Sequence, residues 1–311
     1  SEGALEAFKE SIRLAPDYAR PNWQLGNFLI RAGKINDGFV SIRQAAASDH
    51  LFVQNAIDLA WAIYPGNTSA IEQIVRPDNN SSRIALAHFY MKQGLANEAM
   101  RLYREAGGLS YIEERKILNE LIAAHKFPEA YEVWLNSHRQ VAESGNKGAG
   151  VLIDGGFEGM IGLDDPGFGW QIDRNQQGMK VTLDNELPHS GKRSLRVDWT
   201  GSNTPEYVPV QQLVLVNPNS NYRLKLSVRT KQVVSGGLPL VIVVDAGSGQ
   251  FLGQTPLFSS GTTPWNDFGA DFKTATNTQA VKIQLLRQNC SSGACPMFGN
   301  VWIDDFGLQN L

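Results

Sequence analysis

The chain has 311 residues, 42% of them hydrophobic and 19% charged, a composition typical of folded globular domains with substantial cores. This length favours two domains. The formal net charge of −3 and the scattered lysines and arginines argue against a nucleic-acid binder, which normally carries a basic face. No apolar run approaches the roughly 20 residues that span a bilayer.

Small and aromatic residues recur through the first half of the chain. Ala4 and Phe8 are spaced i, i+4 and therefore share one face of a helix. A second copy begins at Gly38, 34 residues further on. The other members of the pattern are Ile42 and Ala45, Ala70 and Ile74, Ala99, Tyr103 and Ala106, and Ala130 and Trp134.

This pattern resembles tetratricopeptide (TPR) repeats, in which a small residue on the second helix lets the two helices of a pair approach closely. The resemblance is good for residues 1–50 and 81–107 and looser for 51–80 and 108–140. It implies an α-solenoid over residues 1–144. Because Ala4 falls on a second helix, we expect this solenoid to be truncated at its N-terminus.

A stack of such helix pairs offers a groove for a protein partner. The first helices of the pairs carry polar residues that are candidates to line it, namely Asn22, Asn27, His88 and Lys92. The repeat aromatics Phe8, Tyr90, Tyr103 and Trp134 are better explained as packing between helices. Residues 145–150, with three glycines, are predicted to be a linker.

From residue 151 onward, short runs alternate between apolar and polar residues, with the period of two that is typical of half-buried strands. Clusters of Gly, Pro, Asn and Ser separate them and predict turns. Many short strands without helices between them indicate an antiparallel sandwich or jelly roll. The predicted strands are residues 194–199, 208–216, 222–229, 240–244, 281–286 and 301–306.

A set of short motifs in this half is similar to the carbohydrate-binding modules of families 4, 9 and 22. In order, they are Gly156-Phe157-Glu158, Gly169-Trp170, the segment from Ser190 to Leu195, Gln212 with Pro218 and Tyr222, and the segment from Gly299 to Asp305. The resemblance covers nearly all of residues 151–311. It implies a galactose-binding-like jelly-roll sandwich of two antiparallel sheets.

The same resemblance implies a structural calcium ion where the first and last strands meet. Its side-chain ligands would be Glu158 and Asp304, and backbone oxygens near Gly156 and Lys192 would complete the shell. Ca²⁺ prefers six to eight carboxylate and carbonyl oxygens. The alternative is that Glu158 forms a salt bridge with Lys192 or Arg193 and that Asp304 caps a strand end.

Sugar binding requires exposed aromatic rings flanked by planar polar groups. The candidates are Trp170, Tyr207, Trp265, Gln211 and Arg287. The alternative for Trp170 is a place in the core, and for Trp265 packing at the end of the sandwich. The sequence therefore supports a sugar-binding fold more strongly than a sugar-binding activity.

The two cysteines, Cys290 and Cys295, lie in a Gly/Ser loop. They fit a small disulfide loop or two free thiols, and they are too few for a zinc site. We expect a disulfide, which would indicate an extracytoplasmic, periplasmic or secreted protein.

The sequence shows no catalytic constellation. The carboxylate pairs Asp164-Asp165 and Asp304-Asp305 are sequence neighbours rather than two groups facing each other across a cleft. The leading hypothesis is a non-catalytic adaptor, with repeats that bind a protein and a sandwich that binds a glycan, in polysaccharide assembly or export. The alternatives are a structural scaffold whose sandwich binds no sugar, and the accessory region of a larger glycan-active enzyme.

Overall fold

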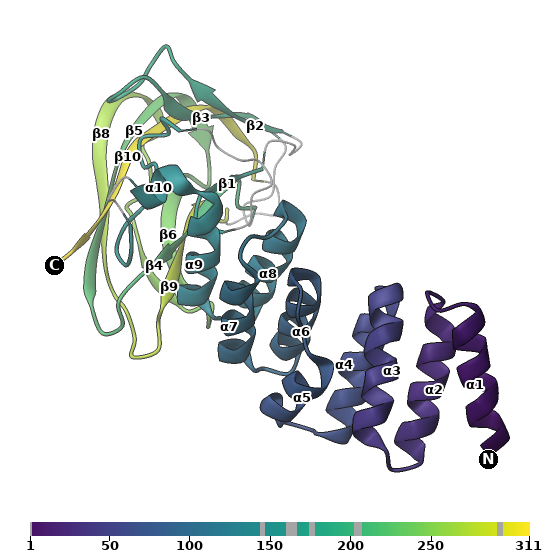
Figure 1. Ribbon diagram of the computed structural model, residues 1–311. Helices are drawn as coiled ribbons and strands as arrows, with labels where there is room; N and C mark the ends of the chain where they lie inside the picture. Colours follow the sequence, from purple (N-terminus) through teal and green to yellow (C-terminus); the bar gives the residue numbers. More distant parts are fainter. Residues whose placement is uncertain (1, 144–146, 160–166, 174–177, 202–206, 291–294) are drawn as a thin grey trace. The chain divides into compact units, whose positions relative to one another are not determined.

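The computed structural model describes residues 2–143, 147–159, 167–173, 178–201, 207–290 and 295–311 (Figure 1). Its contacts divide the chain into two compact units, Ser1–Glu113 and Glu114–Leu311. The helices end at Glu143, and the first strand begins at Trp170. The division into units therefore falls before the change from helices to strands, because the last helices pack with the sandwich.

The described part of the first half contains ten helices. The first unit holds α1 (Glu2–Leu14), α2 (Ala19–Arg31), α3 (Ile35–Ser48), α4 (Leu51–Ile63), α5 (Thr68–Val75), α6 (Asn80–Lys92) and α7 (Ala96–Ala106). Helix α8 (Tyr111–Ala123) crosses the division, and α9 (Phe127–Ser137) and α10 (Arg139–Glu143) belong to the second unit.

A three-residue turn recurs between helices. Gly33 follows α2 with φ +80°, and its N–H donates to Ile30 O while the N–H of the next residue donates to Leu29 O. The same bonds and a positive φ occur at Gly94 after α6 and at His125 after α8. These are left-handed C-terminal caps that satisfy the last carbonyls of a helix. They turn the chain back and so pair α2 with α3 and α6 with α7, as the repeat pattern predicted.

Two glycines let α2 and α3 pack closely against each other. A methyl group on Gly38 of α3 would lie 2.5 Å from Ile30 Cγ1 of α2, and one on Gly26 would lie 2.7 Å from Ile42. Among the repeat aromatics, Tyr90, Tyr103 and Trp134 are buried as predicted. Phe8 is half-buried.

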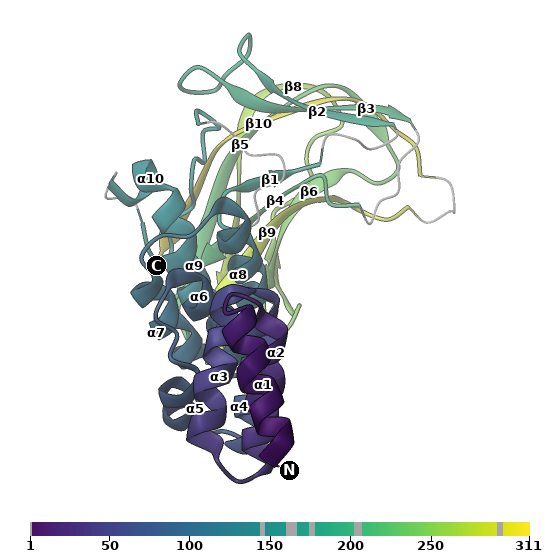
Figure 2. The same ribbon diagram turned by 45° about the vertical axis from the view of Figure 1, so that its right-hand side comes forward.

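Two five-stranded antiparallel sheets form the sandwich, and Figure 2 shows them as two layers. Sheet A has the order β1-β4-β9-β6-β7, and sheet B has the order β2-β3-β10-β5-β8. All six predicted strands are strands. The bounds are β1 (Trp170–Ile172), β2 (Met179–Asp184), β3 (Ser194–Gly201), β4 (Val210–Leu215), β5 (Asn221–Ser235), β6 (Pro239–Asp245), β7 (Phe251–Gln254), β8 (Gly261–Lys273), β9 (Ala280–Arg287) and β10 (Met297–Asn310).

Alternation along the strands builds the core between the sheets. Val210, Ile283 and Val241 point inward from sheet A, and Val197 and Ile303 from sheet B. Their intervening residues lie on the outer faces. Strands β1, β2, β7 and β8 escaped the sequence prediction, because they are short or carry polar residues and proline.

Helix α9 contacts the sandwich within the second unit. The ring of Phe168, just before β1, lies 4.8 Å from the Tyr131 ring and 6.0 Å from the Trp134 ring. The N–H of Gly148 donates to Tyr131 Oη at 3.2 Å, and the N–H of Gly150 donates to Leu215 O. The described part of the predicted linker, residues 147–150, is therefore bonded into this unit, while residues 145 and 146 lie outside the described chain.

Candidate functional site

Trp170 lies in the core and not at a surface. It is 4% exposed, its Nε1–H donates to Asp154 O at 2.8 Å, and its ring packs against Phe157 and Phe306. A buried ring whose N–H is already used cannot stack on a sugar. The prediction that Trp170 contacts a ligand is therefore wrong, and the alternative of a core residue holds.

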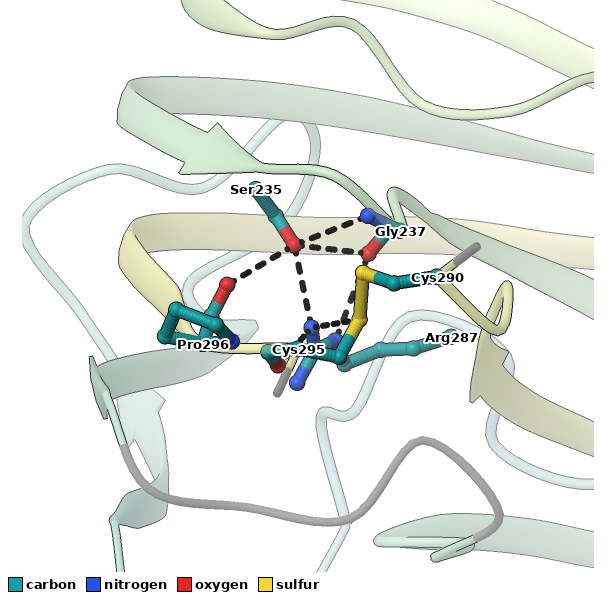
Figure 3. Close-up of a disulfide and its surroundings, with 6 residues drawn as sticks. All are labelled: Ser235, Gly237, Arg287, Cys290, Cys295 and Pro296. Atoms are coloured by element: carbon teal, nitrogen blue, oxygen red, sulfur yellow. Dashed lines mark hydrogen bonds between the residues drawn. A yellow bond between two sulfur atoms is a disulfide. The ribbon is translucent and has the colours of Figure 1, made fainter. Parts of the chain in front are cut away.

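Arg287 is buried at the end of β9 (Figure 3). Its guanidinium donates to Gly237 O, to Ser235 Oγ at 3.0 Å and to Cys295 O at 2.7 Å. Burial lowers the pKa of this guanidinium. Arg287 thus joins the end of β9 to the β5–β6 turn, and its predicted role as a ligand residue is wrong because its donors face the protein interior.

Cys290 and Cys295 are joined by a disulfide next to Arg287 (Figure 3). A methyl group on Gly237 would lie 3.1 Å from Cys295 Sγ, so the disulfide packs directly on the β5–β6 turn. Residues 291–294 between the two cysteines lie outside the described chain.

The other predicted ligand residues do not gather at one place. Tyr207 is half-buried against the core, near Met179 and Trp199. Trp265 lies on the other sheet, on β8, with its ring 5.2 Å from the His189 ring. Only Gln211 lies on the outer face of sheet A, since its neighbour Val210 points into the core.

Gln211 is the centre of a row of three glutamines across sheet A. The strand register places it opposite Gln171 of β1 and Gln284 of β9. Gln284 Nε2 donates to Gln211 Oε1 at 2.9 Å, and Gln211 Nε2 donates to Gln171 Oε1 at 2.9 Å. These bonds orient all three amides the same way. Each amide keeps at least one N–H, and Gln284 keeps its carbonyl oxygen, for an outside partner.

The row continues across the rest of the sheet. Ile242 of β6 lies opposite Gln284, and the exposed Gln254 of β7 lies opposite Ile242. In the adjacent row, Phe251 pairs with Val244 and is 55% exposed. The outer face of sheet A therefore combines oriented planar amides with an exposed aromatic ring, the two kinds of group that bind a pyranose ring.

Sequence reasoning missed Gln171, Gln284 and Phe251. A signal existed for Gln284, which occupies an outward position between the inward apolar residues Ile283 and Leu285; Gln211 lies between the inward residues Val210 and Gln212. Only the register, however, places them side by side.

The four residues predicted to hold calcium lie close together. Glu158 Oε1 accepts the N–H of Lys192 at 2.6 Å and that of Arg193 at 3.0 Å. A methyl group on Gly156 would lie 3.7 Å from Asp304 Oδ1 and 3.8 Å from Glu158 Cγ. In the part of the chain that the structure describes, neither Glu158 nor Asp304 forms a salt bridge with the side chain of Lys192 or Arg193; both carboxylates accept backbone N–H groups instead.

The electrostatics of this cluster suit a cation. Asp304 is fully buried and accepts the N–H groups of His189, Ser190 and Asp305, yet burial raises its pKa. The two backbone donors hold the pKa of Glu158 below its usual range. Glu158 Oε2 and the remaining lone pairs of both carboxylates are hard oxygen donors of the type that Ca²⁺ prefers. The two carboxylates fit Ca²⁺ in donor type but make only part of a shell, so backbone oxygens would have to supply the rest. Over the described residues, no cluster of three or more His, Cys, Asp or Glu side chains suits a metal.

Two of the predicted groove residues are not on a surface. Asn22 is 2% exposed and His88 is 8% exposed. Asn27, by contrast, lines a cavity of about 580 Å³ in the first unit. Lys92, at the end of α6, is exposed. Asp164 and Asp165 lie outside the described chain.

No protein-family model and no curated protein matches this chain. Several solved structures that are similar to about half of this chain are carbohydrate-binding modules. The xylan-binding CBM22-1 domain of Paenibacillus barcinonensis Xyn10C is 17% identical, with 53% of this chain and 97% of that domain covered and a TM-score of 0.36. TmCBM61, in complex with β-1,4-galactotriose, is 18% identical over 51% and 97%, with a TM-score of 0.35.

A family 4 module is 12% identical over 51% of this chain and 99% of that one, with a TM-score of 0.39. Identities and TM-scores this low do not assign a ligand. Among the described helices, none is long and apolar enough to cross a membrane.

Proposed function

We propose that the sandwich binds a glycan on the outer face of sheet A. The observation that carries this proposal is the hydrogen-bonded row Gln171–Gln211–Gln284, whose amides are held in one orientation across three strands. A planar amide donates and accepts on adjacent atoms and so matches two neighbouring sugar hydroxyls. Ordering the amides before binding lowers the entropy cost of association.

Phe251 would supply the apolar contact. Its ring is exposed on the edge strand β7, which β6 separates from β9, so it lies two strands from Gln284 and in the next row. At about 4.8 Å per strand, the ring lies roughly 10 Å from the amide row, so a glycan of more than one sugar would bond to the amides and place an apolar C–H face on this ring. The binding is non-catalytic, since the proposed contacts hold a sugar without a paired acid and base.

The wider role that we propose is an extracytoplasmic adaptor, in which the TPR-like helices hold a protein partner while the sandwich holds a glycan. The disulfide supports a location outside the cytoplasm, where such bonds persist. Polysaccharide assembly or export is a setting that needs both activities.

A structural calcium ion at Glu158 and Asp304 is also part of the proposal. It would neutralise two carboxylates from opposite ends of the sandwich sequence. Backbone oxygens near Gly156 and Lys192 would complete its shell. The ion would hold the segment before β1 to β10 and would take no part in glycan binding.

Affinity electrophoresis and calorimetry against neutral and acidic polysaccharides test the glycan proposal. The wild-type chain should bind at least one polysaccharide, and replacing Gln171, Gln211 and Gln284 together by alanine should abolish that binding. Gln309→Ala, an exposed glutamine on β10 of sheet B, is the matched control and should bind normally. A panel without any binder, or a triple variant that binds like wild type, would refute the proposal.

A second candidate function is a scaffold, in which the sandwich only covers the end of the helical stack. The packing of Phe168 against Tyr131 and Trp134 favours it, because these contacts already tie α9 to the sandwich. A chain that binds no glycan but loses stability on Phe168→Ala would support this candidate.

A further inference from the structure

The first unit contains a second candidate binding site, separate from the sandwich. A cavity of about 580 Å³ is lined on one side by Arg20, Trp23, Gln24, Asn27 and Arg31 of α2. Phe8 of α1 and Phe52 of α4 complete it. The positions on α2 are spaced i, i+3, i+4, i+7 and i+11, so all five side chains project from one helical face.

The floor of this cavity is aromatic. The Trp23 and Phe52 rings lie 5.2 Å apart and are tilted by 36°. Both rings are only half-buried, and Phe8 is half-buried as well. Three aromatic residues with exposed surface line the cavity and favour a ligand that carries an apolar or aromatic group.

The rim of the cavity is basic. No carboxylate lines it. Arg20 and Arg31 are exposed, and neither forms an ion pair with any residue that the structure describes; Arg31 Nε donates only to Asn27 O, at 3.3 Å. The Asn27 amide donates to Trp23 O and keeps its own carbonyl oxygen for a partner. Two guanidinium groups at opposite ends of an aromatic floor are therefore available to anions.

We propose that this cavity binds an acidic peptide segment that carries an aromatic residue between two carboxylates. The inference rests on the proposed partner-binding role of the helices and is independent of glycan binding. Guanidinium groups pair with carboxylates through two parallel hydrogen bonds. Gln24 and Asn27 match the N–H and C=O groups of a peptide backbone.

Helix geometry sets the spacing of the carboxylates. Arg20 and Arg31 are eleven positions apart, which corresponds to about 16 Å along α2 at about 1.5 Å per residue. An extended peptide advances about 3.3 Å per residue, so acidic residues about five positions apart would reach both arginines. The aromatic side chain between them would lie over Trp23 and Phe52.

The test is fluorescence anisotropy of the full chain with short labelled peptides. The first peptide carries Phe midway between two Asp residues spaced about five positions apart; the second has Asn for Asp, and the third has Ser for Phe. The first should bind at least about fivefold more tightly than the others, and added salt should weaken it. Arg20→Gln/Arg31→Gln should remove that preference, whereas Arg20→Lys/Arg31→Lys should keep part of it.

Arg13→Gln on α1 is the matched control, an exposed arginine outside the cavity, and should bind like wild type. Equal binding of the acidic and the Asn peptides would overturn the proposal, as would an equal loss in Arg13→Gln. The proposal would also be overturned if polygalacturonate bound more tightly than any peptide and the double Gln variant abolished that binding. This result would assign the cavity to an acidic glycan. The sheet A glycan titration, run on the same variants, shows separately whether the proposed function fails.

Discussion

Trp302 Nε1 donates a 2.7 Å hydrogen bond to Asp184 Oδ2, which joins β10 to β2 across the intervening strand β3. Trp302 points away from the core but is only 2% exposed, because the Arg196 guanidinium lies over its ring, 5.1 Å from the centroid, and that of Arg229 lies 5.9 Å away. The outer face of sheet B is thus a bonded polar network built around one indole.

This network predicts sensitivity to acid. Burial would raise the pKa of Asp184, but the bonds from Trp302 and from the N–H groups of Glu186 and Leu187, with the Arg196 charge, outweigh it and hold the pKa below its usual range. The stabilisation is therefore present above the unfolded pKa of about 3.9 and is lost as pH falls through the lower folded pKa.

Asp184→Asn should lower the free energy of unfolding near neutral pH by about 1–3 kcal/mol, because one donor loses a charged acceptor. It should also flatten the decline in stability that wild type shows below about pH 4. Urea unfolding followed by tryptophan fluorescence measures both effects. Asp37→Asn, an exposed carboxylate on α3, is the control; an identical pH profile in wild type and Asp184→Asn would contradict the prediction.

Phe251→Ala should weaken glycan binding without unfolding the chain. Since Phe251 is 55% exposed, its ring adds little to the core, and its loss from a sugar contact should cost about 1 kcal/mol, or about fivefold in Kd. Phe298→Ala is a close match, 50% exposed but on sheet B. Calorimetry with the bound polysaccharide compares the two variants, and equal losses would argue against sheet A as the binding face.

Calcium should stabilise the sandwich. For a Kd between about 10⁻⁴ and 10⁻³ M, about 10 mM Ca²⁺ should raise Tm by about 3–8 °C. Chelation should reverse the rise, and Glu158→Gln or Asp304→Asn should abolish it. The exposed Glu186→Gln should retain the response. A chain that shows no calcium-dependent change in Tm or heat of binding has no such site.

Arg287 should matter for stability and not for binding. Arg287→Gln leaves Cys295 O without its guanidinium donor and removes one of the two donors to Gly237 O, the other being Ser235 Oγ, and should cost about 1–3 kcal/mol. Arg223→Gln breaks only the exposed pair with Asp271 and should cost less than about 1 kcal/mol. Glycan affinity per folded molecule should be unchanged in both variants. A loss of glycan affinity in Arg287→Gln alone would show that Arg287 is a ligand residue after all.

The sequence by itself determined the two kinds of secondary structure and most of the strands. Alternating runs such as residues 281–286 fix a strand locally, because one face must meet the core and the other must not. The small residue Gly38 in the repeat pattern predicted a closely packed helix pair, and a side chain at this position would collide with α2. The nearness of Glu158 to Lys192, far apart in the chain, followed from a family resemblance and not from local pattern.

Tertiary structure alone decided which polar residues share a surface. Gln171, Gln211 and Gln284 meet because two strand registers align them, and a shift of one residue would turn each inward. Trp170 and Arg287 were predicted to bind a ligand because aromatic and basic side chains occur both in cores and in binding sites. The sequence alone does not distinguish these two roles. Their burial depends on neighbours brought from distant strands, which local composition does not specify.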